Sequence, residues 1–179
     1  MNKTFAALAI NFVGFQVLWF VAVYGAAGGW GWAAWLVLVV MQLGVWTLNR
    51  RWRRDISLLA AGAAACILFE PVWLATSFLE YVDWPRRWLA PAWIWALWLG
   101  FAVSFNYCLA WLRSKLWLAA LFGAVGGVFS VTVGINFGAA STPQGWWPLA
   151  LSYAAVWAAV VPALAYLARR LDEEQESYA

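Results

Sequence analysis

The chain has 179 residues, of which 66% are hydrophobic and only 11% are charged. Soluble globular domains carry roughly 25% charged residues. Apolar runs long enough to cross a hydrocarbon core of about 30 Å, each about 18 residues or more, recur along the chain. This composition excludes a soluble domain and predicts an all-α fold, a polytopic transmembrane bundle. The formal charge is +3, and the basic residues lie beside the apolar runs. Membrane topology explains this charge better than binding to nucleic acid, so we expect no nucleic-acid partner.

The chain contains no histidine. Histidine is the commonest metal ligand and the commonest general base. Haem held by histidine, zinc peptidase helices and Ser-His-Asp triads are therefore excluded, and we expect neither a metal nor a cofactor. The two cysteines, Cys66 and Cys108, fall inside apolar runs and are interpreted as buried structural thiols. No nucleophile motif and no phosphate-binding glycine loop is present.

The pattern predicts six membrane spans, at about residues 4–26, 30–48, 56–71, 91–112, 116–138 and 148–168. The first span is favoured as a retained helix over a cleaved signal peptide, because its apolar run is long and aromatic. The third span either ends at Pro71 or continues across it towards residue 79. Residues 1–170 are predicted to form one six-helix transmembrane domain, and residues 171–179 a short acidic cytoplasmic tail that is soluble and frayed.

Positive charges are distributed unequally between the two ends of the predicted spans. Nine lie on one side and two, Arg86 and Arg87, on the other. Cytoplasmic loops carry the excess of lysine and arginine, so both termini are predicted to be cytoplasmic in a bacterial inner membrane. The nine are Lys3, Arg50, Arg51, Arg53, Arg54, Arg113, Lys115, Arg169 and Arg170.

Most of the 17 tryptophans lie near the ends of the spans, as expected for an aromatic belt at the two membrane interfaces. A few lie deeper, including Trp98 and Trp157. These could line a groove for an acyl chain or a ring, and packing within the bundle or against lipid is the alternative.

Glu70 is the ionisable residue that lies clearly inside an apolar span. A carboxyl group in hydrocarbon costs free energy and is by default a candidate for function. Pro71 follows it and cannot donate a hydrogen bond to the carbonyl of Ile67. Three readings stay open: an internal hydrogen bond made by a neutral carboxyl, an interfacial position if the helix ends at Pro71, or a functional proton relay, substrate contact or general base.

Other polar residues fall at similar depths when counted at about 1.5 Å per residue. If their side chains face inward, they form a polar file leading from the inner leaflet to Glu70. If not, each one forms a single hydrogen bond to a neighbouring helix. The predicted ligand-binding residues are Glu70, Ser130, Asn106, Gln16, Gln42 and Trp98, and any catalytic role would fall to Glu70.

The fifth span carries small residues at every fourth position, a spacing that allows a second helix to approach closely. These glycines are predicted to serve helix packing and not catalysis. They are Gly123, Gly126, Gly127, Gly134 and Gly138.

Residues 62–140 resemble the bacterial membrane family Domain of Unknown Function 2878. The resemblance is carried by residues 90–98, APAWIWALW, by Asn106, by residues 109–112, LAWL, and by the glycines of residues 123–127 and 134–138. Members of that family often have Asn-His at the place of Asn106-Tyr107, and usually Asp at the place of Glu70. They also often have Gly-Pro-Leu-Ser-Tyr where residues 127–131 read GVFSV. The resemblance implies a small inner-membrane protein without an assigned activity.

The sequence supports a hypothesis of a protein that binds a lipid or a small apolar ligand, as an accessory to envelope lipid modification. Its expected partners are membrane lipids and lipid-modifying enzymes. Two alternatives stay open: an enzyme that acts on a lipid tail with Glu70 as acid or base, and a small proton-coupled transporter. Whether the protein is an enzyme, and its oligomeric state, are left undecided by the sequence.

Overall fold

The fold is given by a computed structural model that describes residues 2–49 and 52–176. The predicted fold class is confirmed, since the described residues form six α-helices, with a short 3-10 helix and two strands of two residues each. Arg50 and Arg51 of the predicted basic run, and residues 1 and 177–179, lie outside the described residues. The elements are α1 (Lys3–Ala27), α2 (Ala33–Leu48), α3 (Trp52–Ala75), β1 (Glu80–Tyr81), α4 (Ala92–Ser104), η1 (Ala110–Leu112), α5 (Leu116–Asn136), β2 (Ala140–Ser141) and α6 (Trp146–Glu176).

Four of the described helices, α1, α3, α5 and α6, are long and apolar enough to cross a membrane. The shortest of them, α5, has 21 residues, which corresponds to about 32 Å. The other two, α2 and α4, are apolar but shorter, with 16 and 13 residues. By length and composition this is a membrane protein.

Two helix ends differ from the sequence prediction, and the sequence leaves a third open. Of the two alternatives for the third span, the structure has the one that continues across Pro71, and α3 ends at Ala75. The fourth helix ends at Ser104 instead of near residue 112, and the turns after it carry Asn106 and Tyr107, whose side chains hydrogen-bond Asp55. The sixth continues to Glu176 instead of ending near residue 168, so much of the acidic segment expected to fray is helical.

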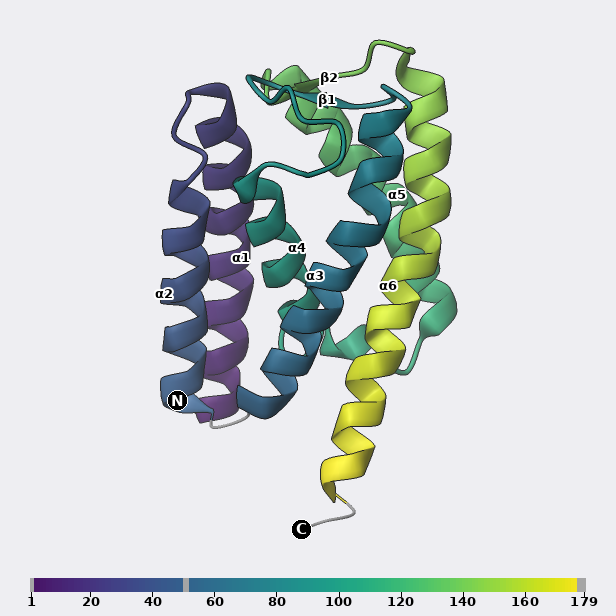
Figure 1. The fold of residues 1–179 in the computed structure, drawn as a ribbon. Coiled ribbons are helices and arrows are strands. Elements are labelled where there is room, and N and C mark those ends of the chain that lie inside the picture. The colour runs from purple at the N-terminus through teal and green to yellow at the C-terminus, as the bar shows by residue number, and fades with distance from the viewer. Residues whose placement is uncertain (1, 50–51, 177–179) are drawn as a thin grey trace.

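The helices form three neighbouring pairs (Figure 1). Helix α1 packs on α2, α3 on α4, and α5 on α6, while α4 also contacts α1 and α2 and α3 also contacts α6. Strand β1 pairs antiparallel with β2, with Glu80 opposite Ser141. This small sheet lies at one end of the bundle, and both chain termini lie at the opposite end (Figure 1).

Two glycines of α5 hold it against α6. A Cβ atom at Gly123 would lie 2.2 Å from the backbone oxygen of Trp157, and one at Gly127 would lie 2.6 Å from the ring of the same tryptophan. Any side chain at these positions would push the helices apart. Gly62 plays the same part where α3 crosses α4, since a Cβ there would lie 2.7 Å from the carbonyl oxygen of Trp98.

The remaining glycines predicted to serve packing lie elsewhere. No described atom would lie within 4 Å of a Cβ at Gly126 or at Gly138. Gly138 has a φ of +79°, so it serves the turn after α5, where a left-handed backbone favours glycine. A Cβ at Gly134 would meet only Val23 of α1, at 4.0 Å. Helix packing therefore does not account for the spacing of Gly126 and Gly138.

Candidate functional site

A cavity of ≈ 330 Å³ lies inside the bundle. Its wall takes side chains from α1, α3, α4, α5 and α6 and from both short strands, and most of them are apolar. This volume lies within the range of small-molecule sites, about 300–1,000 Å³. Four of the six residues predicted to bind a ligand line it: Glu70, Trp98, Ser130 and Gln16.

Glu70 lies at the polar end of this cavity. Its side chain is 2% exposed, so the interfacial position considered from the sequence does not apply. The hydroxyl of Tyr81 donates to Oε2 at 2.6 Å, and the indole Nε1 of Trp98 donates to Oε1 at 2.8 Å. Burial, and then the neighbouring Glu70 carboxyl, raise the pKa of Tyr81 well above its ordinary range, so the tyrosine keeps the proton that it donates. Both carboxyl oxygens thus already accept a hydrogen bond from the protein.

Aromatic rings form much of the wall beside Glu70. The rings of Trp98 and Trp157 are stacked, with centroids 4.7 Å apart and an angle of 10° between planes. Phe101 meets Trp157 edge to face, with centroids 5.2 Å apart. The indole Nε1 of Trp157 is buried and has no hydrogen-bond partner among the described residues. Trp157 therefore lines the cavity with its ring and carries a buried N–H that no described residue satisfies.

The cavity has its mouth between α1 and α5. Three of its lining residues are exposed on the outside of the bundle: Gln16 on α1, and Phe122 and Phe129 on α5, which are 41% and 69% exposed. Behind this opening the indole Nε1 of Trp19 donates to Ser130 Oγ at 2.8 Å and joins the two helices. The mouth thus faces the surroundings of the helices and not either end of the bundle.

The two short strands close one end of the cavity. Tyr81 of β1 and Ala140 of β2 are Cα partners in the sheet, and both line the cavity. Val82 adds a further bond by donating its backbone N–H to the carbonyl of Ala139 at 3.1 Å. Because Tyr81 also binds Glu70, the closure and the polar end of the cavity depend on the same residue.

A second buried carboxyl group, Asp55, lies near the opposite end of α3 and is 0% exposed. Four side chains donate to it, each at 2.7 Å: Gln42 and Trp46 from α2, and Asn106 and Tyr107 from the turns after α4. In the sequence, Asp55 follows Arg53 and Arg54 and directly precedes the predicted third span, so the sequence assigns it to the charged residues outside that span. No sequence signal pairs it with these donors, which lie 9 to 52 positions away along the chain.

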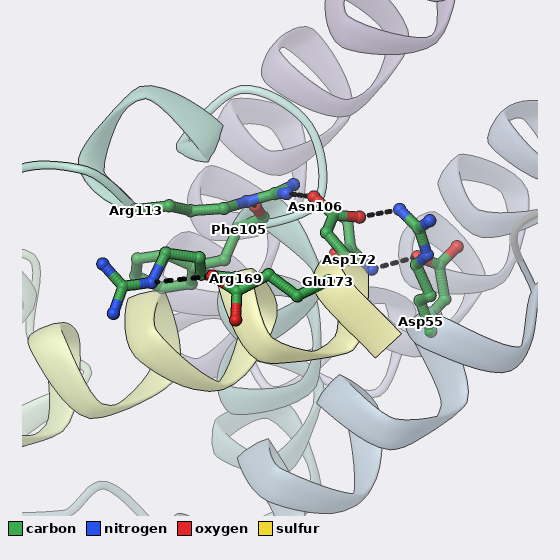
Figure 2. A network of polar contacts seen from close by, with 8 residues as sticks. Asp55, Phe105, Asn106, Arg113, Arg169, Asp172 and Glu173 are labelled. Atoms are coloured by element: carbon green, nitrogen blue, oxygen red, sulfur yellow. Dashed lines mark hydrogen bonds and ion pairs between the residues drawn. The ribbon is translucent and has the colours of Figure 1, made fainter. Parts of the chain in front are cut away.

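Beside Asp55, ion pairs tie the end of α6 to the bundle. Asp172 of α6 accepts from Arg54 of α3 and from Arg113, which follows η1 (Figure 2). The Nε of Arg113 also donates to the backbone carbonyl of Phe105 at 2.6 Å. These contacts join α6 at Asp172 to α3 and to the residue that follows η1.

The predicted polar file is replaced by separate groups. Gln42 and Asn106 bind Asp55 and do not line the cavity. Asn11 accepts from the backbone N–H of Cys108 at 3.4 Å. Gln16 lies at the cavity mouth, and Ser130 lies just inside it. Residues at similar depths on different helices can point in different directions. These side chains do, so they do not meet.

The polar groups that line the cavity are one carboxyl group, two tyrosines, several indoles, the Ser130 hydroxyl and, at the mouth, the Gln16 amide. Within residues 2–49 and 52–176, no group of three His, Cys, Asp or Glu side chains gathers in a way that could hold a metal ion. Among the described residues that line the cavity, none is a lysine or an arginine. The arrangement is suited to an apolar molecule with limited polarity at one end.

Comparison with known proteins identifies one family. The family model described as "Protein of unknown function (DUF2878)" matches residues 8–163. No curated protein and no solved structure matches the chain. The match covers most of the chain and agrees with the resemblance noted in residues 62–140. The chain therefore belongs to the DUF2878 family of proteins of unknown function.

Proposed function

We propose that this protein binds a lipid or another small apolar molecule inside its helical bundle, within a bacterial inner membrane. One observation carries the proposal: an aromatic-walled cavity of ≈ 330 Å³ that opens between α1 and α5 and ends at Glu70. Membrane lipids are the source of ligands that such an opening favours. A membrane enzyme that modifies lipids is the partner that we propose to supply or use the ligand.

The contacts of Glu70 suit a residue that organises one end of a binding site. Both oxygens of Glu70 already accept short hydrogen bonds, from Tyr81 and Trp98. These bonds hold the carboxyl group in one orientation, as expected of a residue that organises one end of a binding site.

We further propose that the chain crosses the membrane six times, with both termini in the cytoplasm. Both termini lie at one end of the bundle (Figure 1), the end of Arg54 and Arg113, whereas Arg86 and Arg87 lie in the loop after β1. The basic residues of the sequence are divided nine to two between these ends. The positive-inside rule then places the termini in the cytoplasm.

Reporter fusions test this topology. Green fluorescent protein fused after residue 179 should fluoresce, because it folds in the cytoplasm, and alkaline phosphatase inserted between Arg86 and Arg87 should be active, because it folds outside. The same phosphatase fused after residue 179 serves as the control and should be inactive. Phosphatase activity at the C-terminal position and not in the loop would reverse the proposed orientation.

The Gly126→Leu variant tests the binding site. A Cβ at Gly126 would contact no described atom within 4 Å, and Gly126 lines the cavity, so a leucine there should occupy the cavity without disturbing helix packing. We expect ligand retained per molecule of purified protein to fall about tenfold or more, which corresponds to about 1.4 kcal/mol. The measurement is mass spectrometry of lipids that copurify after gentle extraction.

The matched control is Ala155→Leu, which adds similar bulk at an exposed position of α6 that does not line the cavity. It should retain as much ligand as the wild type. Equal retention by Gly126→Leu and by the wild type would show that the copurifying lipid sits elsewhere and would remove the support for this site.

A further inference from the structure

We infer that the cavity takes a neutral, single-chain or single-ring apolar molecule with one oxygen at its leading end, which enters sideways from the bilayer between α1 and α5. This inference rests on the proposed function and names the chemical class and the orientation of the ligand. Four features of the cavity support it: its mouth, its unsatisfied donor, its charge and its volume.

The position of the mouth selects the source of the ligand. Gln16 lies 13 residues beyond the start of α1, and Phe129 lies 13 residues beyond the start of α5. At 1.5 Å per residue both lie about 20 Å along their helices. In a hydrocarbon core of about 30 Å this depth is within the apolar region. A molecule that reaches the mouth must therefore be dissolved in the bilayer.

The unsatisfied donor selects an oxygen at the end that enters first. The buried indole N–H of Trp157 has no partner among the described residues, and a hydrocarbon chain offers it none. Trp157 stacks on Trp98, whose own N–H is bound to Glu70, so the two indoles lie together beside the polar end of the cavity. Leaving a buried donor unpaired costs free energy. Because the ring lines the cavity, a small turn of the indole would bring its N–H to a ligand hydroxyl or carbonyl oxygen and remove this cost.

The charge of the wall selects a neutral oxygen. A carboxylate or phosphate would lie near Glu70 with no lysine or arginine among the described lining residues to balance it. An uncompensated charge in the membrane interior is strongly unfavourable. An ammonium group has three N–H donors, and Glu70, which already accepts from Tyr81 and Trp98, is the one acid among the described lining residues. A hydroxyl or a carbonyl needs no counter-charge.

The volume limits the ligand to one chain or ring. At ≈ 330 Å³ the cavity lies at the lower end of the range of small-molecule sites, about 300–1,000 Å³. A site of this size fits one chain or one ring better than the two chains of a phospholipid.

Binding of three probes of matched length tests the inference. Radiolabelled 1-decanol, decane and decanoate are equilibrated with proteoliposomes and with liposomes of the same composition that lack protein, and the difference gives saturable binding. We expect 1-decanol to bind at least about tenfold more tightly than decane or decanoate. Gly126→Leu, which narrows the mouth, should abolish saturable binding of 1-decanol, and Ala155→Leu should leave it unchanged.

The Trp157→Phe variant tests the proposed donor. It removes the indole N–H and keeps an aromatic ring, so the advantage of 1-decanol over decane should fall about tenfold while the affinity for decane stays the same. Trp147→Phe serves as the control, because that tryptophan is exposed and does not line the cavity. An unchanged preference in folded Trp157→Phe would overturn the assignment of the donor.

The outcomes separate this inference from the proposed function. If none of the three probes binds saturably, the proposed function itself is overturned. Equal binding of 1-decanol and decane would retain an apolar site and overturn the requirement for an oxygen. Tighter binding of decanoate would overturn the requirement for neutrality. If Trp157→Phe does not fold, the wild-type series and Gly126→Leu still decide the question.

Discussion

The Asp55→Ala variant should unfold far more easily than the wild type, because it removes the acceptor of four hydrogen bonds. Gln42, Trp46, Asn106 and Tyr107 all donate to this carboxyl group, and all but the half-buried Trp46 are buried. Hydrogen bonds between membrane helices average about 0.6 kcal/mol, so loss of four accounts for about 2 kcal/mol. Where the loss leaves a buried donor without an acceptor, the cost of that bond rises to about 1–3 kcal/mol. A total of several kcal/mol is a large part of the stability of a small bundle.

Detergent-induced unfolding in bicelles, followed by tryptophan fluorescence, measures this loss. The matched control is Glu173→Ala, which removes an acid whose ion pairs with Arg169 and Arg170 are between exposed side chains. Exposed pairs contribute about 0–1 kcal/mol, so this control should unfold like the wild type. If Asp55→Ala also unfolded like the wild type, the four hydrogen bonds to Asp55 would not be what holds that end of the bundle together.

Alanine at Gly123 should destabilise the bundle, whereas alanine at Gly126, one turn further along α5, should not. The new Cβ at position 123 would lie 2.2 Å from the backbone oxygen of Trp157 and 2.7 Å from Val161. Backbone cannot move aside as a side chain can, so α5 and α6 must separate, and overpacking of this kind costs about 1–3 kcal/mol. At position 126 the Cβ would meet nothing described within 4 Å.

The same unfolding measurement compares the two variants. Gly126→Ala should match the wild type or exceed it slightly, because alanine is favoured over glycine in a helix by about 1 kcal/mol. Gly123→Ala should also bind less 1-decanol, since Gly123 and Trp157 both line the cavity. Equal stability of the two variants would mean that α5 does not depend on this close approach.

Helix α3 connects the two polar centres of the molecule. Asp55 and Glu70 lie 15 residues apart on it, which corresponds to about 22 Å. Asp55 has four donors and no place in the cavity wall, so its role is to hold α2, α3 and the turns after α4 together. Glu70 has two donors and lines the cavity. The polar network around Asp55 and the cavity therefore lie at different ends of one helix.

The sequence by itself determined the class of protein, its helices and the position of one buried acid. Hydropathy and span length are local properties of the chain, and they placed four of the six candidate ligand residues, Glu70 among them, where a cavity exists. The small residues of α5 likewise indicated a close helix contact, which the structure has at Gly123 and Gly127.

Only the tertiary structure decided which polar groups meet. Asp55 lies beside arginines at the end of a span. A side chain at such a position can face water, lipid headgroups or the protein interior. The helices that pack over Asp55 bury it in the interior. The turns that follow the end of α4 at Ser104 bring Asn106 and Tyr107 to Asp55, 51 and 52 positions away along the chain. Depth along a helix follows from counting residues, whereas the direction of a side chain depends on how the helix is rotated against its neighbours. Rotation is set by packing across the whole bundle, which no local stretch of sequence encodes.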